Sequence, residues 1–278
     1  MQIKQILIDS LKYPLSDWKK ILTLGIIILA IGVTGSYEYL GVTNAVVIWF
    51  LLIAGFIIGL LVNGYLFRIL KSSLDDLPEL PKFDNWIEMF KDGVSVFLVG
   101  VVYFLPIILI MLYLIIVFSE NFMFGSLELN SLVIDIFQSL IDRFLLSLGS
   151  SLPFFLALKS EILIYSVMGF FGTIYLIIVT PLFLMTLANM ANYYDGLISA
   201  FRFREILDEI KCIGWMNLMK WYVMVMIIYF IISSPLTFLL LFNIELVYNI
   251  VWVLFSVVIL PYTYIFFARA VALIYISE

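Results

Sequence analysis

Four carboxylates lie within one short segment of the chain and could bind a metal. They are Asp75, Asp76, Glu79 and Asp84. Carboxylate oxygens are the ligands that Ca²⁺ and Mg²⁺ prefer, so such a density can hold a divalent cation. The spacing does not match an EF-hand loop, and no glycine stands at a turn position. We therefore predict a solvated acidic loop and no metal, although the sequence alone leaves metal binding by this loop open.

Basic and apolar residues recur at helical spacing in a second segment, residues 199–211. The apolar positions i, i+3, i+4 and i+7 are Phe203, Ile206, Leu207 and Ile210. This pattern predicts an amphipathic helix. Its Arg202 and Arg204 can bind anionic lipid headgroups or pair with the acidic loop. We favour pairing, because Glu205 and other acids give the polar face a mixed sign.

The sequence lacks most side chains that carry enzyme chemistry. It has no histidine and one cysteine, Cys212, which removes the usual zinc ligands, imidazole catalysis and any internal disulfide. It contains no nucleophile elbow and no phosphate-binding loop. We predict no catalytic residue and no cofactor. The net charge of -5 comes from short polar segments and indicates no nucleic-acid partner.

The elements that must position these residues are membrane-spanning helices. Of the 278 residues, 64% are hydrophobic and 13% are charged, whereas soluble domains are about half apolar and a quarter charged. The mean hydropathy is +1.16. We predict an all-α polytopic transmembrane helix bundle, a single membrane domain over 1–278. Its six spans are expected at 21–37, 44–67, 94–118, 162–188, 221–242 and 246–267.

The charge distribution predicts how the bundle is oriented. All of the 15 Lys and Arg residues except Arg143 and Lys159 fall on one side of the membrane in this topology. Basic flanks stay in the cytoplasm during insertion, so we predict a cell-membrane protein with both termini cytoplasmic. The first span has no convincing cleavage site and is expected to be retained. An amphipathic helix on the outer face is predicted at about 131–148.

The polar residues in or beside the spans are mainly asparagines, namely Asn63, Asn189 and Asn249. Such residues more often form interhelical hydrogen bonds than bind a substrate. Gly55 and Gly59 form a GxxxG motif, which packs helices closely and gives weak support for an oligomer.

The acidic loop is part of an elbow between the second and third spans. Two prolines of this loop break the helix that carries Arg68. Asn85 is expected to cap a new helix with the glutamate three residues on, and Trp86 starts the apolar face of that helix. Arg68 and Arg269 lie at span ends, where long side chains can snorkel to the interface.

Several segments together resemble one known family. They are Tyr13–Lys20 near the start, Asn63–Arg68, Leu80–Pro81, Asn85–Trp86 and Phe90–Gly93 around the elbow, Ser199–Leu207, and Pro261–Tyr262 with Arg269–Leu273 near the end. The set resembles the domain-of-unknown-function 4013 family of mainly archaeal membrane proteins, over nearly the whole chain. The resemblance implies a multi-pass cell-membrane protein with no established activity or active-site residues.

The leading hypothesis is a non-enzymatic membrane protein that organises membrane lipids or a cytoplasmic or membrane protein partner. Its candidate cytoplasmic interaction surface comprises Arg68, Pro81, Asp84, Trp86, Arg202, Arg204, Glu205 and Arg269. A small-molecule or lipid permease is an alternative, and it requires a polar mid-membrane cavity near the asparagines. A lipid-active enzyme is a second alternative, and it requires the loop carboxylates to converge with the Arg202 segment.

Overall fold

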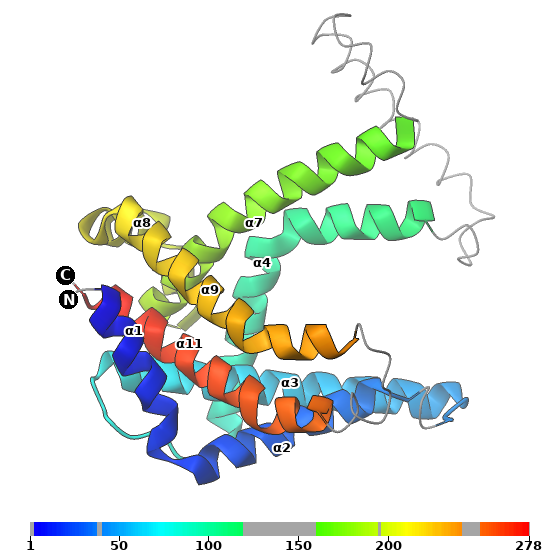
Figure 1. The fold of residues 1–278 in the computed structure, drawn as a ribbon, viewed down its shortest axis with the longest axis horizontal. Helices are drawn as coiled ribbons and strands as arrows, with labels where there is room; N and C mark the ends of the chain where they lie inside the picture. The colour runs from blue at the N-terminus through cyan, green and yellow to red at the C-terminus, as the bar shows by residue number, and fades with distance from the viewer. Residues whose placement is uncertain (1–2, 38–40, 119–159, 194–195, 241–250, 278) are drawn as a thin grey trace, which may run out of the picture. The chain divides into compact units, whose positions relative to one another are not determined.

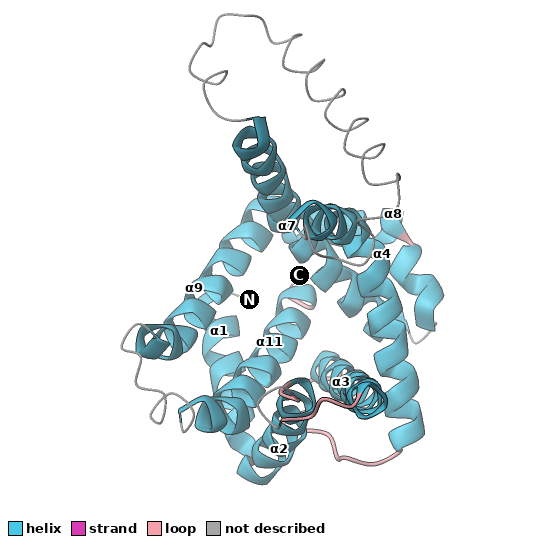
Figure 2. Ribbon diagram, turned by 90° about the vertical axis from the view of Figure 1, so that its right-hand side faces the viewer, coloured by secondary structure: helices cyan, strands magenta, loops and turns pink. Residues whose placement is uncertain are grey.

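The computed structural model describes residues 3–37, 41–118, 160–193, 196–240 and 251–277. These residues fold into helices and contain no strand (Figures 1 and 2). The α-helices are α1 (Ile3–Lys12), α2 (Trp18–Gly35), α3 (Ala45–Leu74), α4 (Trp86–Phe118), α7 (Ser160–Tyr193), α8 (Phe203–Ile213), α9 (Trp215–Leu240) and α11 (Leu260–Tyr275). The other turns are the 3-10 helices η1 (Tyr13–Ser16) and η2 (Gly196–Phe201) and the π-helical turn η3 (Phe255–Ile259).

In the described part of the chain, six helices are long and apolar enough to cross a membrane, which confirms the predicted bundle. Several helices extend beyond the predicted spans. The helix α3 continues past Phe67 to Leu74, and the short helix predicted after Asn85 forms one continuous helix, α4, with the span predicted from Val94. Apolar composition marks only the part of a helix that crosses hydrocarbon, whereas backbone hydrogen bonds continue the helix into its charged flank. The helix predicted at 131–148 lies outside the described residues.

The chain divides into two compact units, Met1–Gly100 with Pro181–Glu278 as unit 1 and Val101–Thr180 as unit 2. In unit 1, α11 packs along α3, α2 packs on α3, and α1 lies beside α11 (Figures 1 and 2). One core of buried side chains joins three of these helices and includes Leu24 of α2, Tyr65 and Ile69 of α3, and Ile265 of α11. The last helix is therefore built into the same core as the first span.

Paired glycines let α3 and α4 approach each other directly. A Cβ atom at Gly64 of α3 would collide with the backbone carbonyl of Met89 in α4, and one at Gly93 would collide with that of Leu60. Small residues at such crossings are typical of membrane helices, because they allow close backbone contact. This contact fixes the start of α4 against the end of α3 and so sets the elbow between them.

The two glycines of the GxxxG motif have different surroundings. At Gly55 an added Cβ would collide with the hydroxyl of Thr34 in α2, so this glycine packs within the chain. At Gly59 an added Cβ would meet no atom within 4 Å. The close packing typical of the motif is thus an intrachain contact at Gly55. An oligomer through this pair stays a prediction.

A proline shapes the contact between α2 and the last span. Pro261 has no N–H to donate to the carbonyl of Val257 one turn earlier, and the chain there forms the π-helical turn η3. The Val257 carbonyl lies against Gly25 of α2, where a Cβ atom would collide with it. Because Gly25 has no side chain, α2 can pack against the Val257 carbonyl, to which Pro261 cannot donate a hydrogen bond.

The described part of unit 2 consists of segments of α4 and α7. The Tyr175 hydroxyl donates a hydrogen bond to the Tyr103 carbonyl at 2.6 Å, which joins the two helices. Phe170 and Phe171 of α7 are 63% and 55% exposed. Exposed apolar surface of this kind is typical of a side of the protein that contacts lipid.

Candidate functional site

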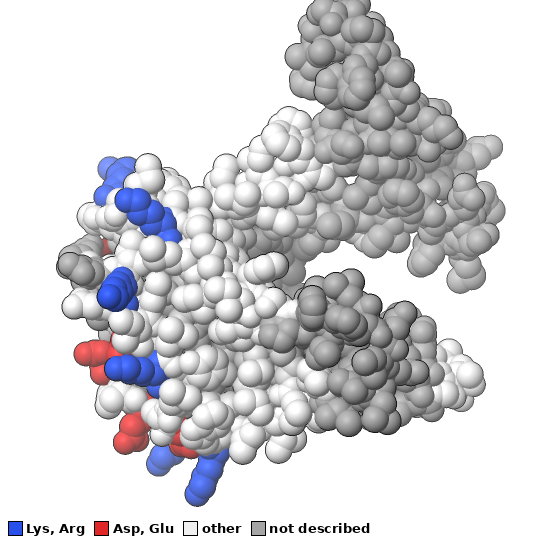
Figure 3. All heavy atoms as spheres, in the orientation of Figure 1, with Lys and Arg blue, Asp and Glu red and all other residues white. Residues whose placement is uncertain are grey.

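Charged side chains gather at one end of unit 1, over α1, α8 and the loop between α3 and α4 (Figure 3). We call this region the charged end, and we call residues 75–85 the elbow. The elbow joins the helices that cross at Gly64 and Gly93. Most residues of the predicted interaction surface lie here, so the charged end is the candidate functional site.

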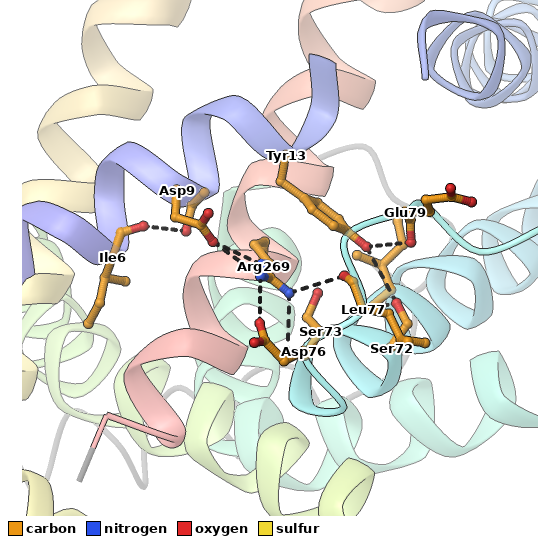
Figure 4. Close-up of polar contacts among 11 residues, drawn as sticks. Ile6, Asp9, Tyr13, Ser72, Ser73, Asp76, Leu77, Glu79 and Arg269 are labelled. Atoms are coloured by element: carbon orange, nitrogen blue, oxygen red, sulfur yellow. Dashed lines mark hydrogen bonds and ion pairs between the residues drawn. The ribbon is translucent and has the colours of Figure 1, made fainter. Parts of the chain in front are cut away.

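Arg269 of α11 is the centre of the polar contacts at the charged end (Figure 4), and it is only 5% exposed. Its Nε donates to a carboxylate oxygen of Asp9 in α1 at 3.2 Å. Its Nη2 donates to a carboxylate oxygen of Asp76 in the elbow at 3.1 Å. Its Nη1 donates to the carbonyls of Ser73 and Leu77 at 3.3 and 3.5 Å. One guanidinium thus joins the first helix, the last helix and the elbow.

Tyr13 extends this cluster toward α3. Its ring faces the Arg269 guanidinium, with 4.8 Å between Cζ and the ring centroid, which is a cation–π distance. Its hydroxyl donates to the Glu79 carbonyl at 3.1 Å and lies 3.5 Å from the Ser72 hydroxyl (Figure 4). We call Asp9, Tyr13, Asp76 and Arg269 the Arg269 cluster. The expectation that Arg269 snorkels to the interface is corrected, because α1 and the elbow supply acceptors that let the guanidinium stay buried.

Arg68 and Tyr65 of α3 hold the rest of the elbow. Arg68 Nη1 donates to two elbow carbonyls at 3.2 and 2.7 Å and pairs with the Asp84 carboxylate at 2.8 Å. The Tyr65 hydroxyl donates to the Pro81 carbonyl at 3.1 Å, and its ring stacks on Phe83 with centroids 3.8 Å apart. A loop outside regular structure needs partners for its carbonyls, and these two α3 side chains provide them.

Asp17 and Lys20 attach the start of α2 to the same elbow. The Asp17 carboxylate caps α2 by accepting from the amides of Lys19 and Lys20 at 3.1 and 3.3 Å. Lys20 Nζ donates to the Leu80 carbonyl at 2.6 Å and lies 3.2 Å from Asp17. Desolvation raises the pKa of Asp17, but the hydrogen bonds from Lys20 and its charge outweigh this effect and hold the pKa below 3.8.

The four elbow carboxylates do not gather around one point. Asp76, whose φ of +52° is in the left-handed region, pairs with Arg269, while Asp84 pairs with Arg68. Within the described residues, no group of three or more acidic, histidine or cysteine side chains could hold a metal ion. The lipid-active enzyme would need these carboxylates to converge, and the geometry sends Asp76 and Asp84 to different arginines.

The start of α4 differs in detail from the prediction. The helix begins at Trp86 as expected, but Asn85 has a φ of +49° in place of the extended backbone usual for a capping residue. The residues buried against α3 are Met89 and Gly93. Trp86 is 49% exposed, and Ile87 is 74% exposed. The residues that pack on α3 thus lie outside the predicted apolar face, and Trp86 and Ile87 of that face are exposed.

The other predicted arginines lie at the start of α8, with Arg202 as its N-cap residue and Arg204 in its first turn. Arg202 lies 3.5 Å from Glu205 within the same segment, and its guanidinium is 5.9 Å from the Tyr193 ring centroid. Arg204 is exposed. Ile206 and Ile210 are buried, as the amphipathic pattern requires. The two other apolar residues of that pattern, Phe203 and Leu207, are 54% and 39% exposed.

Asn189 of α7 is fully buried and joins three elements of unit 1. Its amide nitrogen donates to the Ser199 carbonyl at 3.0 Å, and its amide oxygen accepts from the Tyr275 hydroxyl at 3.1 Å. These are the interhelical hydrogen bonds expected of an asparagine in a membrane helix. Asn63 is half-buried next to the Gly64 crossing, and Asn249 lies outside the described residues.

Three important residues of the charged end were not in the predicted surface, namely Asp9, Tyr13 and Lys20. A partial signal for Tyr13 and Lys20 existed, since both lie in the Tyr13–Lys20 segment that carries part of the family resemblance. Asp9 gave no local signal, because its partner Arg269 is 260 positions away.

The fold and the site together define a multi-pass membrane protein. Ion pairs and hydrogen bonds join several of its helices at the charged end. Residues 47–241 match the family described as "Protein of unknown function (DUF4013)". This match spans more than half of the chain, so the chain belongs to that family. The matched residues include the elbow and α8, whereas α1 and α11 lie outside them. Comparisons with curated proteins and with solved structures find no match.

Proposed function

We propose that this chain is a non-enzymatic protein of the cell membrane that organises lipid or a protein partner at its charged end. In this proposal the charged end and both termini face the cytoplasm. The orientation rests on the gathering of Lys and Arg at that end, because basic flanks are retained on the cytoplasmic side.

The observation that carries the proposal is that some cations of the charged end hold the fold together, while others are exposed at the surface. Buried or half-buried cations are committed to the fold: Arg269 joins α1, α11 and the elbow, and Arg68 joins α3 and the elbow. The helix α8 instead presents Phe203 and Arg204 at the surface. Exposed apolar and basic side chains side by side are typical of a surface that contacts lipid or a partner.

Two observations favour this function over the alternatives. The elbow carboxylates Asp76 and Asp84 serve as ion-pair partners of two different arginines, which disfavours a lipid-active enzyme. The Asn189 amide is committed to Ser199 and Tyr275, which disfavours its use as a substrate ligand in a permease.

Affinity purification in a mild detergent tests this proposal. Mass spectrometry would identify the proteins and the lipids that accompany the full-length chain. Arg202→Ala/Arg204→Ala is compared with Lys82→Ala/Lys91→Ala, which removes equal charge from exposed elbow and α4 positions. We expect a protein or a lipid class to be enriched with the wild type and the lysine control and lost from the arginine variant. A wild type that carries neither would overturn the proposal and favour the permease, which uptake into proteoliposomes would then examine.

A further inference from the structure

The surface of α8 is divided into sides of different chemistry. Successive residues of an α-helix are rotated by about 100° around its axis. Ile206, Ile210 and Ile213 fall on one side, and they are 2%, 0% and 7% exposed. Phe203 and Leu207, one turn apart, follow on the next side and are 54% and 39% exposed. The helix therefore packs on the protein with one part of its apolar face and leaves the adjacent part uncovered.

The basic residues of α8 border this uncovered apolar strip. Arg204 precedes Leu207 by three positions and Lys211 follows it by four, so both lie beside Leu207 on the helix surface. Glu205 and Glu209, which are one turn apart, fall on the far side. An exposed apolar strip bordered by basic residues is typical of a helix lying in a membrane interface, where cations snorkel to the headgroups. Asp208 lies beside the basic residues, where it pairs with Lys211, so only Glu205 and Glu209 are set apart from them.

Exposed apolar residues also stand on either side of α8 in the chain. Phe201 of η2 meets Phe203 edge to face, with ring centroids 6.4 Å apart. On the other side, Gly214, with a φ of +87°, turns the chain directly into α9, whose Met216 is 69% exposed. Because α9 is one of the six apolar helices, a helix joined to its start by a single glycine must end at the membrane surface.

We propose that α8 is a binding site for anionic phospholipids, with Phe203 and Leu207 among the acyl chains and Arg204 and Lys211 on headgroup phosphates. This inference rests on the proposed function, because it names lipid as what the charged end organises. Lys211 also pairs with Asp208 at 2.8 Å, but both side chains are more than half exposed. Exposed pairs of this kind are weak, so a phosphate competes for the ammonium. The acidic side chains of a soluble protein could also bind these cations. The exposed apolar strip of Phe203 and Leu207 lies on a helix joined to the span α9, and this favours a lipid.

A lipid titration of the full-length protein tests the site. The purified chain in an uncharged detergent is titrated with phosphatidylglycerol, with phosphatidylcholine as the matched lipid and with inorganic phosphate. The midpoint of thermal unfolding reports binding. We expect phosphatidylglycerol to raise the midpoint most. In Arg204→Gln/Lys211→Gln its apparent affinity should fall roughly tenfold or more, since two cations near an anionic surface are lost. The control Lys82→Gln/Lys91→Gln should bind as the wild type.

Three results of the titration would overturn the inference in different ways. If the α8 variant binds phosphatidylglycerol as the wild type does, the site lies elsewhere, and the proposed function survives. If the wild type does not prefer phosphatidylglycerol to phosphatidylcholine, both the inference and the lipid part of the proposed function are wrong. If inorganic phosphate stabilises the chain as well as the lipid does, the ligand is a free phosphate and the membrane is not involved.

The depth of α8 in a bilayer gives an independent measurement. Leu207 and Cys212 lie five positions apart, a rotation of about 140° around the helix, and Cys212 is the only cysteine of the chain and is exposed. Spin labels on native Cys212, or on Leu207→Cys in a Cys212→Ser background, are compared in liposomes. The label at position 207 should be the more accessible of the two to oxygen, which concentrates in the bilayer. The label at position 212 should be the more accessible to a water-soluble nickel chelate. Equal accessibility, or the reverse order, contradicts the proposed orientation.

Discussion

The guanidinium of Arg269 lies 3.2 Å from the carboxylate of Asp9, although the two residues are 260 positions apart in the sequence. This contact joins α1 to α11, and the same guanidinium reaches Asp76 in the elbow. The elbow belongs to the matched family region, whereas both terminal helices lie outside it. The Arg269 cluster therefore attaches the two terminal helices to the part of the chain that defines the family.

Removing the Arg269 side chain should destabilise the protein. Arg269→Ala takes a donor from the Ser73 and Leu77 carbonyls and the shared cation from Asp9 and Asp76. Loss of hydrogen bonds to a buried charged group costs about 1.5–3 kcal/mol each, and the exposure of both carboxylates reduces this cost. We expect a fall of about 2 kcal/mol or more in the free energy of unfolding in detergent.

Two variants sharpen this test of Arg269. Arg269→Lys keeps the charge but lacks the planar set of donors, so it should recover only part of the lost free energy. The exposed Arg204→Gln should leave the stability nearly unchanged. If Arg269→Lys unfolds like the wild type, the multiple contacts of the guanidinium do not contribute as we describe.

Glycines of α3 should differ sharply in their response to an added methyl group. Gly64→Ala places a Cβ against the Met89 carbonyl of α4, whereas Gly59→Ala meets no atom within 4 Å. Overpacking of this kind costs about 1–3 kcal/mol, while alanine in an open helix position stabilises by about 0.5–1 kcal/mol. We expect a lower unfolding midpoint for Gly64→Ala and an equal or higher one for Gly59→Ala. Equal losses at both positions would show that α3 and α4 do not cross as described.

Local periodicity was sufficient to predict helices but not the faces that they bury. The six spans and the helix α8 follow from the length and spacing of apolar runs. Trp86, predicted on the apolar face of the helix, is 49% exposed, whereas Met89 and Gly93, which the pattern did not single out, pack on α3. In a membrane the outward side chains are as apolar as the inward ones, so the hydrophobic pattern loses the contrast that it has in soluble proteins.

The site was predicted in part, and the missing part is nonlocal. Arg68, Asp84 and Arg269 were chosen as elbow or span-end residues, and all three lie at the charged end. Their partners could not be inferred, because an ion pair such as Arg269 with Asp9 depends on how α1 and α11 pack. Single-sequence patterns report on residues within a few turns of each other, and this contact joins the opposite ends of the chain.

The buried amide of Asn189 should be coupled to Tyr275. Asn189→Ala removes the donor to Ser199 and the acceptor for the Tyr275 hydroxyl. Leaving buried polar groups without these partners costs about 1–3 kcal/mol, and Tyr275→Phe alone should cost about 1 kcal/mol. A double-mutant cycle on unfolding in detergent should show that the double variant loses less than the two single losses added together. Additive losses would mean that the two side chains do not interact.

Asp17 should stabilise α2 in a pH-dependent way. Its pKa lies below the ordinary 3.8, so its charged form is favoured by folding. The contribution of this charge to the free energy of unfolding is therefore fully present above about pH 4. It is lost as the pH falls through the lowered pKa of the folded state. Asp17→Ala should cost about 1 kcal/mol at neutral pH through loss of the cap. Asp17→Asn retains a capping side chain, and its difference from the wild type should disappear in acid. A difference that persists at low pH would contradict the role of the charge.

The native cysteine makes the orientation of the bundle directly measurable. Cys212 is exposed on α8 at the charged end, and it is the only cysteine of the chain. If the charged end faces the cytoplasm, a membrane-impermeant maleimide should label wild-type Cys212 only after the cells are permeabilised. Thr43, exposed in the turn between α2 and α3, gives the matched opposite reporter, because Thr43→Cys in a Cys212→Ser background should be labelled in intact cells. Labelling of Cys212 from outside would invert the topology, and with it the cytoplasmic setting that we propose for α8 and its lipid.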